Sequence, residues 1–182
     1  MKEVALHILD IAENSLNAGA DTVEIRIELN RADKRLRIEI SDNGKGMSRE
    51  MLSRTADPFF TSRTTRKVGL GIPLLRQHAE MTGGSVELRS AENKGTTVLA
   101  AFDTSHPDIQ PLGDIVGCWW LLASGNPETD VVLRCQVDQE HFEIGSQQVR
   151  EELEVEELSG NELREELKRL IINNLEEIGL DW

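Results

Sequence analysis

Apolar and polar residues alternate along two neighbouring stretches near the N-terminus, at 23–29 and 36–40. Val, Ile and Leu occupy one side of each stretch, and charged residues occupy most of the other side. A period of two predicts strands with one buried face, and the polar residues 30–34 between them predict a hairpin turn. We therefore expect an antiparallel sheet that is covered by helices on one face only.

Helical spacing of apolar residues precedes and follows this hairpin. It predicts a first helix over about 2–18, ended near Gly19, and a short helix that begins at Ser48. Another helix is expected to open at Gly69–Ile72 and to run to about Thr82. Two more strands are expected at 86–90 and 96–102. The order of these elements predicts a two-layer α/β sandwich.

The C-terminal part has a weaker pattern. Alternation over 130–137 predicts a strand that pairs with 141–144, and a stripe of Leu and Ile predicts a helix over 161–178. The glutamate run at 151–157 is interpreted as a solvated helix face, and Trp119-Trp120 as core packing.

Charge divides the chain into two regions. Residues 1–103 hold 15 acidic and 15 basic side chains, whereas residues 104–182 hold 18 acidic and 5 basic ones, which accounts for the net charge of −13. This division predicts a domain at 1–104 and a smaller acidic α+β module at 113–182. An acidic surface repels phosphate backbones and anionic lipid, so a protein partner or a second subunit is expected, without nucleic acid or membrane.

Cysteine usage and hydropathy point to a cytoplasmic protein. Cys118 and Cys135 are too few and too far apart for a disulfide framework, and they are expected to be core thiols. No apolar run approaches the roughly 20 residues that a membrane span needs, and residues 4–12 lack the continuous apolar stretch of a signal peptide.

Candidate chemistry begins where the second strand ends, in the sequence Asp42-Asn-Gly-Lys-Gly-Met47. An aspartate followed by Gly-x-Gly places a carboxylate beside backbone without side chains, where a flat heterocycle can enter. The carboxylate can accept a proton from the exocyclic amine of adenine, and it would reject guanine, which has a carbonyl there. This segment therefore predicts adenine recognition.

A second group of residues suits phosphate and a divalent cation. The glycine-rich helix start Gly69-Leu-Gly-Ile72 presents free amides and a positive dipole end, and Arg63 and Lys67 lie just before it. Asp10 and Asn14 lie one turn apart on the first helix, where the Asn14 amide oxygen can bind Mg²⁺.

Other interpretations of these motifs are weaker. Position 74 is Leu and a basic loop, not a strand, precedes Gly69, so a dinucleotide fingerprint is disfavoured, and no P-loop motif exists. His7 and His78 have no second ligand at helical spacing, so packing is favoured over metal binding or self-phosphorylation.

In this order, the motifs resemble those of the GHKL superfamily of ATPases over residues about 4–103, and the run 57–84 is most similar to sensor histidine kinases. The resemblance implies the Bergerat-type ATP-binding fold, a lid at 61–68, and a Gly95-Thr96 turn with Thr96 beside Asp42 at adenine. Asp10 stands where several branches have a glutamate that activates the attacking group. Together these arguments give Asp10 as the catalytic residue, Asn14 as the Mg²⁺ ligand, and the following ATP-binding residues: Asn14, Asn17, Asp42, Gly44, Gly46, Met47, Phe60, Arg63, Lys67, Gly69, Leu70, Gly71, Ile72 and Thr96.

Two functions are consistent with this site. The first is a regulatory Mg²⁺-ATP-binding protein that phosphorylates a histidine or serine of a partner in trans, or hydrolyses ATP slowly. Because the first motif lies almost at the N-terminus, the phosphoacceptor is expected on another protein. The alternative is a switch without kinase activity, in which ATP closes the lid and changes affinity for a partner.

Overall fold

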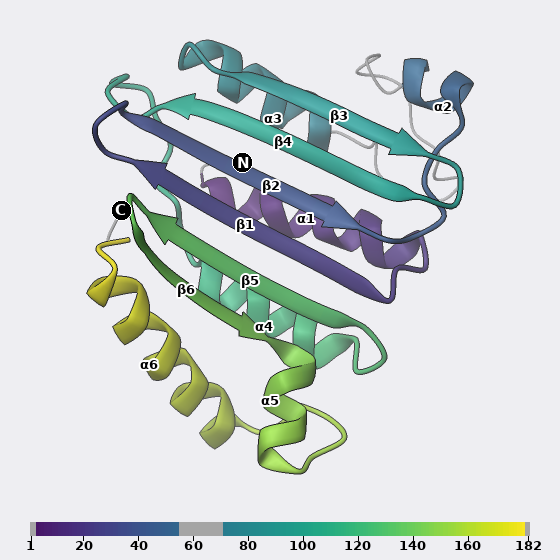
Figure 1. The fold of residues 1–182 in the computed structure, drawn as a ribbon, viewed down its shortest axis with the longest axis vertical. Helices are drawn as coiled ribbons and strands as arrows, with labels where there is room; N and C mark the ends of the chain where they lie inside the picture. Colours follow the sequence, from purple (N-terminus) through teal and green to yellow (C-terminus); the bar gives the residue numbers. More distant parts are fainter. Residues whose placement is uncertain (1–2, 55–70, 181–182) are drawn as a thin grey trace.

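One six-stranded sheet forms the frame of the protein (Figure 1), in a computed structural model that describes residues 3–54 and 71–180. The strand order is β3-β4-β2-β1-β5-β6, and all neighbours are antiparallel except β1 and β5, which are parallel. The strands are β1 (Thr22–Asn30), β2 (Arg35–Asp42), β3 (Ser85–Ala91), β4 (Gly95–Asp103), β5 (Asp130–Val137) and β6 (Glu140–Gly145).

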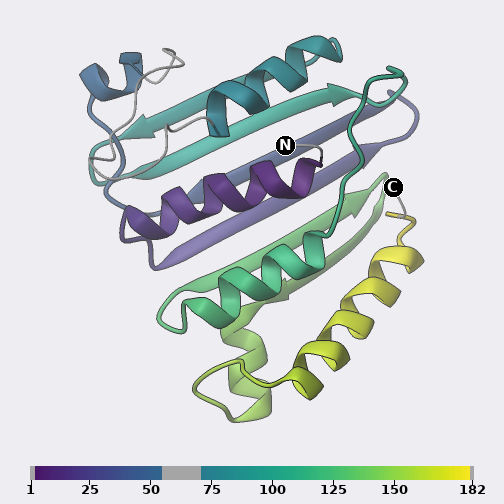
Figure 2. The same ribbon diagram turned by 180° about the vertical axis from the view of Figure 1, so that it is seen from behind.

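Helices α1, α3 and α4 cover one face of this sheet. Seen from behind in Figure 2, α1, α3 and α4 lie over the sheet and run roughly along its strands, while α5 and α6 lie beyond the β6 edge. The opposite face carries no described helix (Figure 1), as the alternating strands predicted. The helices are α1 (Val4–Asn17), α2 (Arg49–Arg54), α3 (Gly71–Met81), α4 (Ile115–Gly125), α5 (Ser146–Leu153) and α6 (Asn161–Glu177).

A single hydrophobic core lies between the sheet and these helices. Ile25 and Ile27 of β1 are almost completely buried, and Trp119 of α4 is fully buried. The Trp119 indole N–H donates a hydrogen bond to the Val131 carbonyl at 2.9 Å, which satisfies the polar atom of this large side chain. The core prediction for Trp119 is therefore confirmed.

Both cysteine thiols are also buried, as expected. Burial raises the pKa of Cys118 to about 11 and that of Cys135 to about 12, so both are protonated at neutral pH. None of the described helices combines the length and apolar character that crossing a bilayer would require.

Strand β5 joins the acidic region to the N-terminal sheet. It pairs with β1 along its whole length, with Ile25 opposite Leu133. A parallel pair needs a long crossover, and here the connection contains α4, which packs against α1. Independent folding of 1–104 and 113–182 stays a prediction, but their strands share one sheet and their apolar residues share one core.

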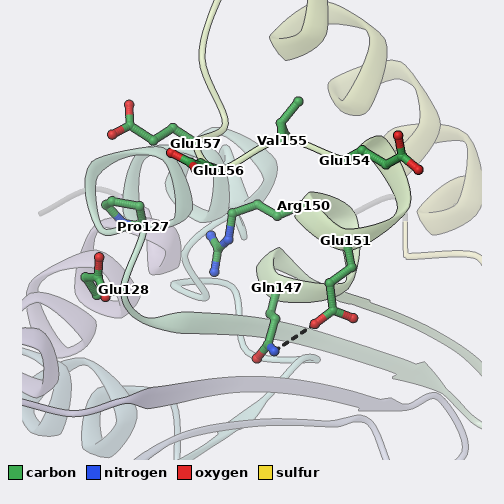
Figure 3. A pocket seen from close by; sticks show the side chains of 9 residues that line it. All are labelled: Pro127, Glu128, Gln147, Arg150, Glu151, Glu154, Val155, Glu156 and Glu157. Atoms are coloured by element: carbon green, nitrogen blue, oxygen red, sulfur yellow. Dashed lines mark hydrogen bonds between the residues drawn. The ribbon is translucent and has the colours of Figure 1, made fainter.

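Two helices of the C-terminal region differ from the sequence pattern. Helix α4 was not predicted, because it is apolar on nearly every side and has no periodic stripe. The glutamate run was predicted as a helix face, yet α5 ends at Leu153 and Glu154 adopts a left-handed backbone with φ 54°. Residues beyond Glu154 instead form a loop that borders a pocket next to α5 (Figure 3).

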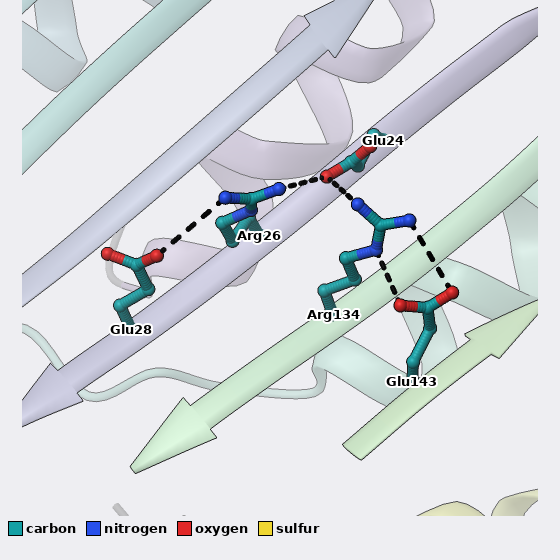
Figure 4. A network of polar contacts seen from close by, with 5 residues as sticks. All are labelled: Glu24, Arg26, Glu28, Arg134 and Glu143. Carbon is teal, nitrogen blue, oxygen red and sulfur yellow. Dashed lines mark hydrogen bonds and ion pairs between the residues drawn. The ribbon is translucent and has the colours of Figure 1, made fainter. Parts of the chain in front are cut away.

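The uncovered face of the sheet carries a chain of charged side chains that crosses β1, β5 and β6 (Figure 4). Arg134 bridges Glu24 at 2.8 Å and Glu143 at 2.6 Å, and Arg26 also binds Glu24 at 2.8 Å. The hydrogen bond to Glu143 raises the pKa of Arg134 above its usual value. These side chains are partly exposed, so each pair adds little stability, but together they keep this face of the joined strands charged.

Candidate nucleotide site

Asp42 is the centre of the candidate site, at the end of β2. Its Oδ1 accepts hydrogen bonds from the Gly44 N–H at 2.9 Å and the Thr96 N–H at 3.2 Å. Its Oδ2 accepts one from the Ser15 hydroxyl of α1 at 2.7 Å. Three elements therefore fix the orientation of one carboxylate. Since two carboxylate oxygens offer about four acceptor positions, one remains for a ligand amine.

The register of the sheet explains why Thr96 reaches Asp42. Strands β2 and β4 pair so that these two residues lie opposite each other, although they are 54 positions apart. Gly95 approaches Asp42 so closely that a Cβ at this position would lie 1.8 Å from the Asp42 carbonyl oxygen, and its φ is +82°. Gly46 has φ +61°, and a Cβ there would lie 2.0 Å from the Ala91 carbonyl oxygen. Glycine is therefore required at position 46, in the loop after Asp42, and at position 95, where β4 begins.

A small hydroxyl network links this loop to the turn between β3 and β4. The Met47 N–H donates to Ser90 Oγ at 2.9 Å, and Ser90 Oγ donates to the Gly95 carbonyl at 2.9 Å. The Ser90 and Thr96 hydroxyls are 2.9 Å apart. Because the single Ser90 proton is directed to Gly95, the Thr96 hydroxyl is the donor of this pair and keeps its lone pairs for a ligand.

Sequence reasoning missed two residues of this arrangement. Ser15 lies on the buried side of α1 and Ser90 at the end of β3, and neither belongs to a recognisable motif. The sequence did hold one signal for Ser15, a polar residue on the apolar stripe of the first helix. Such a residue is buried, and a buried hydroxyl needs a hydrogen-bond partner. Its partner is 27 positions away, which a local pattern does not reveal.

Asp10 and Asn14 are brought to the side of α1 that faces α3. The Asp10 carboxylate rests against Gly71, the first residue of α3, where a Cβ would lie 1.8 Å from Asp10 Oδ2. Asn14 is exposed one turn further along α1. Asn17 is also exposed, and its amide donates to the Glu13 carbonyl at 2.5 Å. The structure thus places Asp10 beside the start of α3, with Asn14 one turn further along α1, and the Asn17 amide bonds to its own helix.

The phosphate-binding residues are described in part. Gly71 is buried at the start of α3, and Ile72 packs against the core. Both therefore present backbone near Asp10, at the positive end of an 11-residue helix. The remaining candidates lie outside the described residues, and their contacts stay predictions: Phe60, Arg63, Lys67, Gly69 and Leu70.

The two histidines of α1 and α3 meet in the structure. The rings of His7 and His78 are 5.8 Å apart, and His78 also contacts Gln110. Burial, with the neighbouring His78, lowers the pKa of His7 to about 4, and burial also lowers the pKa of His78. The pair is therefore neutral at pH 7 and packs between the helices. Within 3–54 and 71–180, no group of three or more His, Cys, Asp or Glu side chains forms a potential metal site.

Comparison with known proteins identifies the N-terminal region. The family model "Histidine kinase-, DNA gyrase B-, and HSP90-like ATPase" matches residues 2–106, more than half of the chain. Similar curated proteins include Sporulation kinase D of Bacillus subtilis, 35% identical over 98 residues, and Sensor protein kinase FleS of Pseudomonas aeruginosa, 35% identical over 92 residues. These matches cover 54% and 49% of this chain, but only 19% and 22% of the relatives.

Structural similarity extends further along the chain than the family match. A crystal structure described as the N-terminal domain of a DNA repair protein superimposes with a TM-score of 0.53 at 17% identity. The superposition covers 79% of this chain and 52% of that chain. The share of this chain is larger than the share that residues 2–106 make up. At this identity the similarity concerns the fold alone, and it includes part of the region after the family match.

Proposed function

This chain belongs to the family of histidine kinase-, DNA gyrase B- and HSP90-like ATPases, and we propose that it is a regulatory Mg²⁺-ATP-binding protein that phosphorylates a partner in trans. Residues 2–106 are its ATP-binding domain. The observation that carries the proposal is the Asp42 carboxylate, held by Ser15, Gly44 and Thr96 with acceptor capacity left over.

Adenine would enter beside Asp42. Its exocyclic amine would donate to the Asp42 carboxylate. Because hydrogen bonds already fix the orientation of this carboxylate, the Asp42 side chain loses little conformational entropy on binding. The Thr96 hydroxyl, oriented by Ser90, offers a further polar contact for the ring. Guanine presents a carbonyl at the same place, and two acceptors would then face each other in a partly buried site. ATP is therefore favoured over GTP.

The triphosphate would extend from adenine toward α1 and the start of α3. The Gly71 and Ile72 backbone lies at the positive end of α3, and Arg63 and Lys67 would add positive charge. The amide oxygen of Asn14 is the kind of ligand that suits Mg²⁺, which prefers oxygen ligands and keeps several waters. Mg²⁺ would supply neutralisation of phosphate charge, while positioning by these residues supports phosphoryl transfer.

One observation favours the second candidate, an ATP-dependent switch without kinase activity. Asp10 is one bond shorter than glutamate and its carboxylate rests against Gly71. Reaching an attacking group from this position would need a water relay or movement of α3. A switch needs Asp42 and Asn14 for binding but no base, and differential affinity for a partner would carry its function.

The proposal is tested by titrating ATP with Mg²⁺ into the wild type and the Asp42→Asn variant in a calorimeter. Loss of a charge-assisted hydrogen bond should cost on the order of 1.5–3 kcal/mol, which is an affinity weaker by about 10- to 150-fold. Asp33→Asn, in the exposed turn between β1 and β2, makes the same chemical change away from the site and serves as the control. Unchanged ATP affinity in Asp42→Asn would contradict adenine recognition by this residue.

A further inference from the structure

A pocket of about 560 Å³ lies in the acidic region of the molecule, next to α5 and the start of β5. Strand β1 separates β5 from β2, the strand that ends at Asp42. It is bordered by α5, by the residues before β5 and by the loop after Glu154 (Figure 3). Its volume is within the range of ligand-binding pockets. Five glutamates line it: Glu128, Glu151, Glu154, Glu156 and Glu157.

Of the residues that the structure describes, Arg150 is the one basic side chain that lines this pocket, and Figure 3 shows its guanidinium pointing into the space between the glutamates. The residue is only 9% exposed. Its Nη2 donates to the Thr129 carbonyl at 3.3 Å, whereas its buried Nη1 has no hydrogen-bond partner within 3–54 and 71–180. Among the described residues no carboxylate forms an ion pair with Arg150, although five surround it.

A buried guanidinium donor without an acceptor is unfavourable, and a ligand acceptor would satisfy it. The surrounding carboxylates in turn attract cations. The matching ligand therefore carries a hydrogen-bond acceptor flanked by positive charges. A metal ion offers no acceptor, and the described residues contain no convergent metal-ligating group. Nucleic acid and anionic lipid would be repelled by the glutamates.

We propose that this pocket binds an extended basic segment of a partner protein. A backbone carbonyl of the segment accepts from Arg150 Nη1, and its lysine or arginine side chains meet the glutamates. Glu154, Glu156 and Glu157 are exposed, so the pocket is open along one side, as an extended chain needs. Val155 between them is also exposed, and it can contact the aliphatic part of a lysine or arginine.

The test measures binding of a short fluorescent peptide of alternating lysine and glycine, with blocked ends, to the full chain by anisotropy. The triple variant Glu154→Gln, Glu156→Gln, Glu157→Gln should bind about tenfold more weakly. The matched control Glu162→Gln, Glu165→Gln, Glu166→Gln removes the same charge from exposed positions of α6 and should change affinity less than about threefold. Equal effects of the two triple variants, or no binding by the wild type, would overturn the proposal.

Arg150 provides a test of opposite sign. If it donates to the peptide backbone, Arg150→Met weakens binding although it removes a positive charge from the pocket. If the pocket acts only as a negative surface, the same substitution strengthens binding, and the proposal is wrong. Should Arg150→Met fail to fold, as judged by its thermal transition, Arg150→Lys keeps the charge but changes the donor geometry, and unchanged affinity would contradict the assignment.

A small ligand is separated from a peptide by competition. Lysine with both its α-amino and α-carboxyl groups blocked carries the same charged side chain but no flanking residues, so it should displace the peptide only weakly. Unlabelled peptide displaces the fluorescent peptide at a certain concentration. If the blocked lysine displaces it at that same concentration, the pocket is an amino-acid site instead. ATP binding is a separate readout: Asp42→Asn should leave peptide affinity unchanged, so failure of one proposal is distinguishable from failure of the other.

Discussion

Asp42 in the N-terminal region and Arg150 in the acidic region are both charged side chains at the border of the same sheet, but the protein satisfies them differently. Three donors of the chain fix Asp42, from α1, its own loop and β4. With the described part of the chain, the Arg150 guanidinium makes one hydrogen bond and leaves a buried donor unused. The first arrangement orients a group for a ligand in advance, whereas the second lacks an acceptor that a ligand can supply.

The regions also differ in overall charge. Residues 1–103 are neutral and residues 104–182 carry the whole net charge, yet β1 and β5 pair along their length across this boundary. The charged network from Glu24 to Glu143 crosses the same junction on the uncovered face. A change in surface charge therefore does not coincide here with a break in the sheet, since surface composition reflects partners as well as folding.

The largest effect should come from removing the acidic region. A chain shortened to residues 1–104 loses β5, which pairs with β1, and α4, which packs against α1. Apolar residues of α1 and an unpaired strand edge would become exposed. We expect the shortened chain to lose its cooperative thermal transition, measured by circular dichroism. A cooperative transition with ATP affinity intact would instead support the independent domain that the charge division predicts.

The next largest effect should be on turnover when Asp10 is substituted, if the protein is a kinase or hydrolase. Asp10→Asn should lower phosphate release or partner phosphorylation by roughly 100-fold while ATP affinity stays nearly unchanged, the usual contribution of a catalytic base. Asn14→Ala, which removes the proposed Mg²⁺ ligand, should weaken ATP binding as well. Labelled ATP and calorimetry separate the two effects. Absence of phosphoryl transfer in the wild type, with partner binding that depends on ATP, would favour the switch.

Burial affects His7 differently from Asp42 and Arg150, because the buried imidazole of His7 is neutral at pH 7. Its pKa is about 4 in the folded protein and about 6.5 in the unfolded chain, so the unfolded chain binds more protons between these values. Stability from this group is complete above about pH 6.5 and falls as the pH decreases toward 4. We expect a loss on the order of 1–2 kcal/mol between about pH 7 and pH 5 in urea titrations. His7→Leu should reduce this loss, and an identical pH dependence would contradict the assignment.

Ser15→Ala should have the smallest effect on stability and on ATP binding. It tests most directly whether hydrogen bonds from the chain orient Asp42. It removes one donor from Asp42 and leaves that carboxylate less completely satisfied. We expect a loss of about 1 kcal/mol in unfolding free energy and a several-fold weaker ATP affinity. Ser53→Ala, on the exposed helix α2, is a control of the same chemistry. Equal effects from both variants would show that the Ser15 bond does not orient Asp42.

Several features of the fold followed from the sequence alone. Alternation over 23–29, 36–40 and 130–137 predicted β1, β2 and β5, because the period of a strand is a local property. Strands were also expected where β3, β4 and β6 lie, the last as the partner of β5. The position of Asp42 at the end of β2, next to its glycine loop, was predicted for the same reason. The family resemblance also depended on short motifs in a given order, and residues 2–106 confirm it.

Only the tertiary structure decided which distant residues meet. The hydrogen bonds from Ser15 and Thr96 to Asp42 join positions 27 and 54 residues apart, and no local period records them. The same holds for β5 beside β1, since parallel pairing depends on how a long crossover packs. Arg150 is the clearest case. The sequence showed an arginine beside a glutamate run, but the burial of its guanidinium with one donor unused results from the packing of α5 against the loops around it.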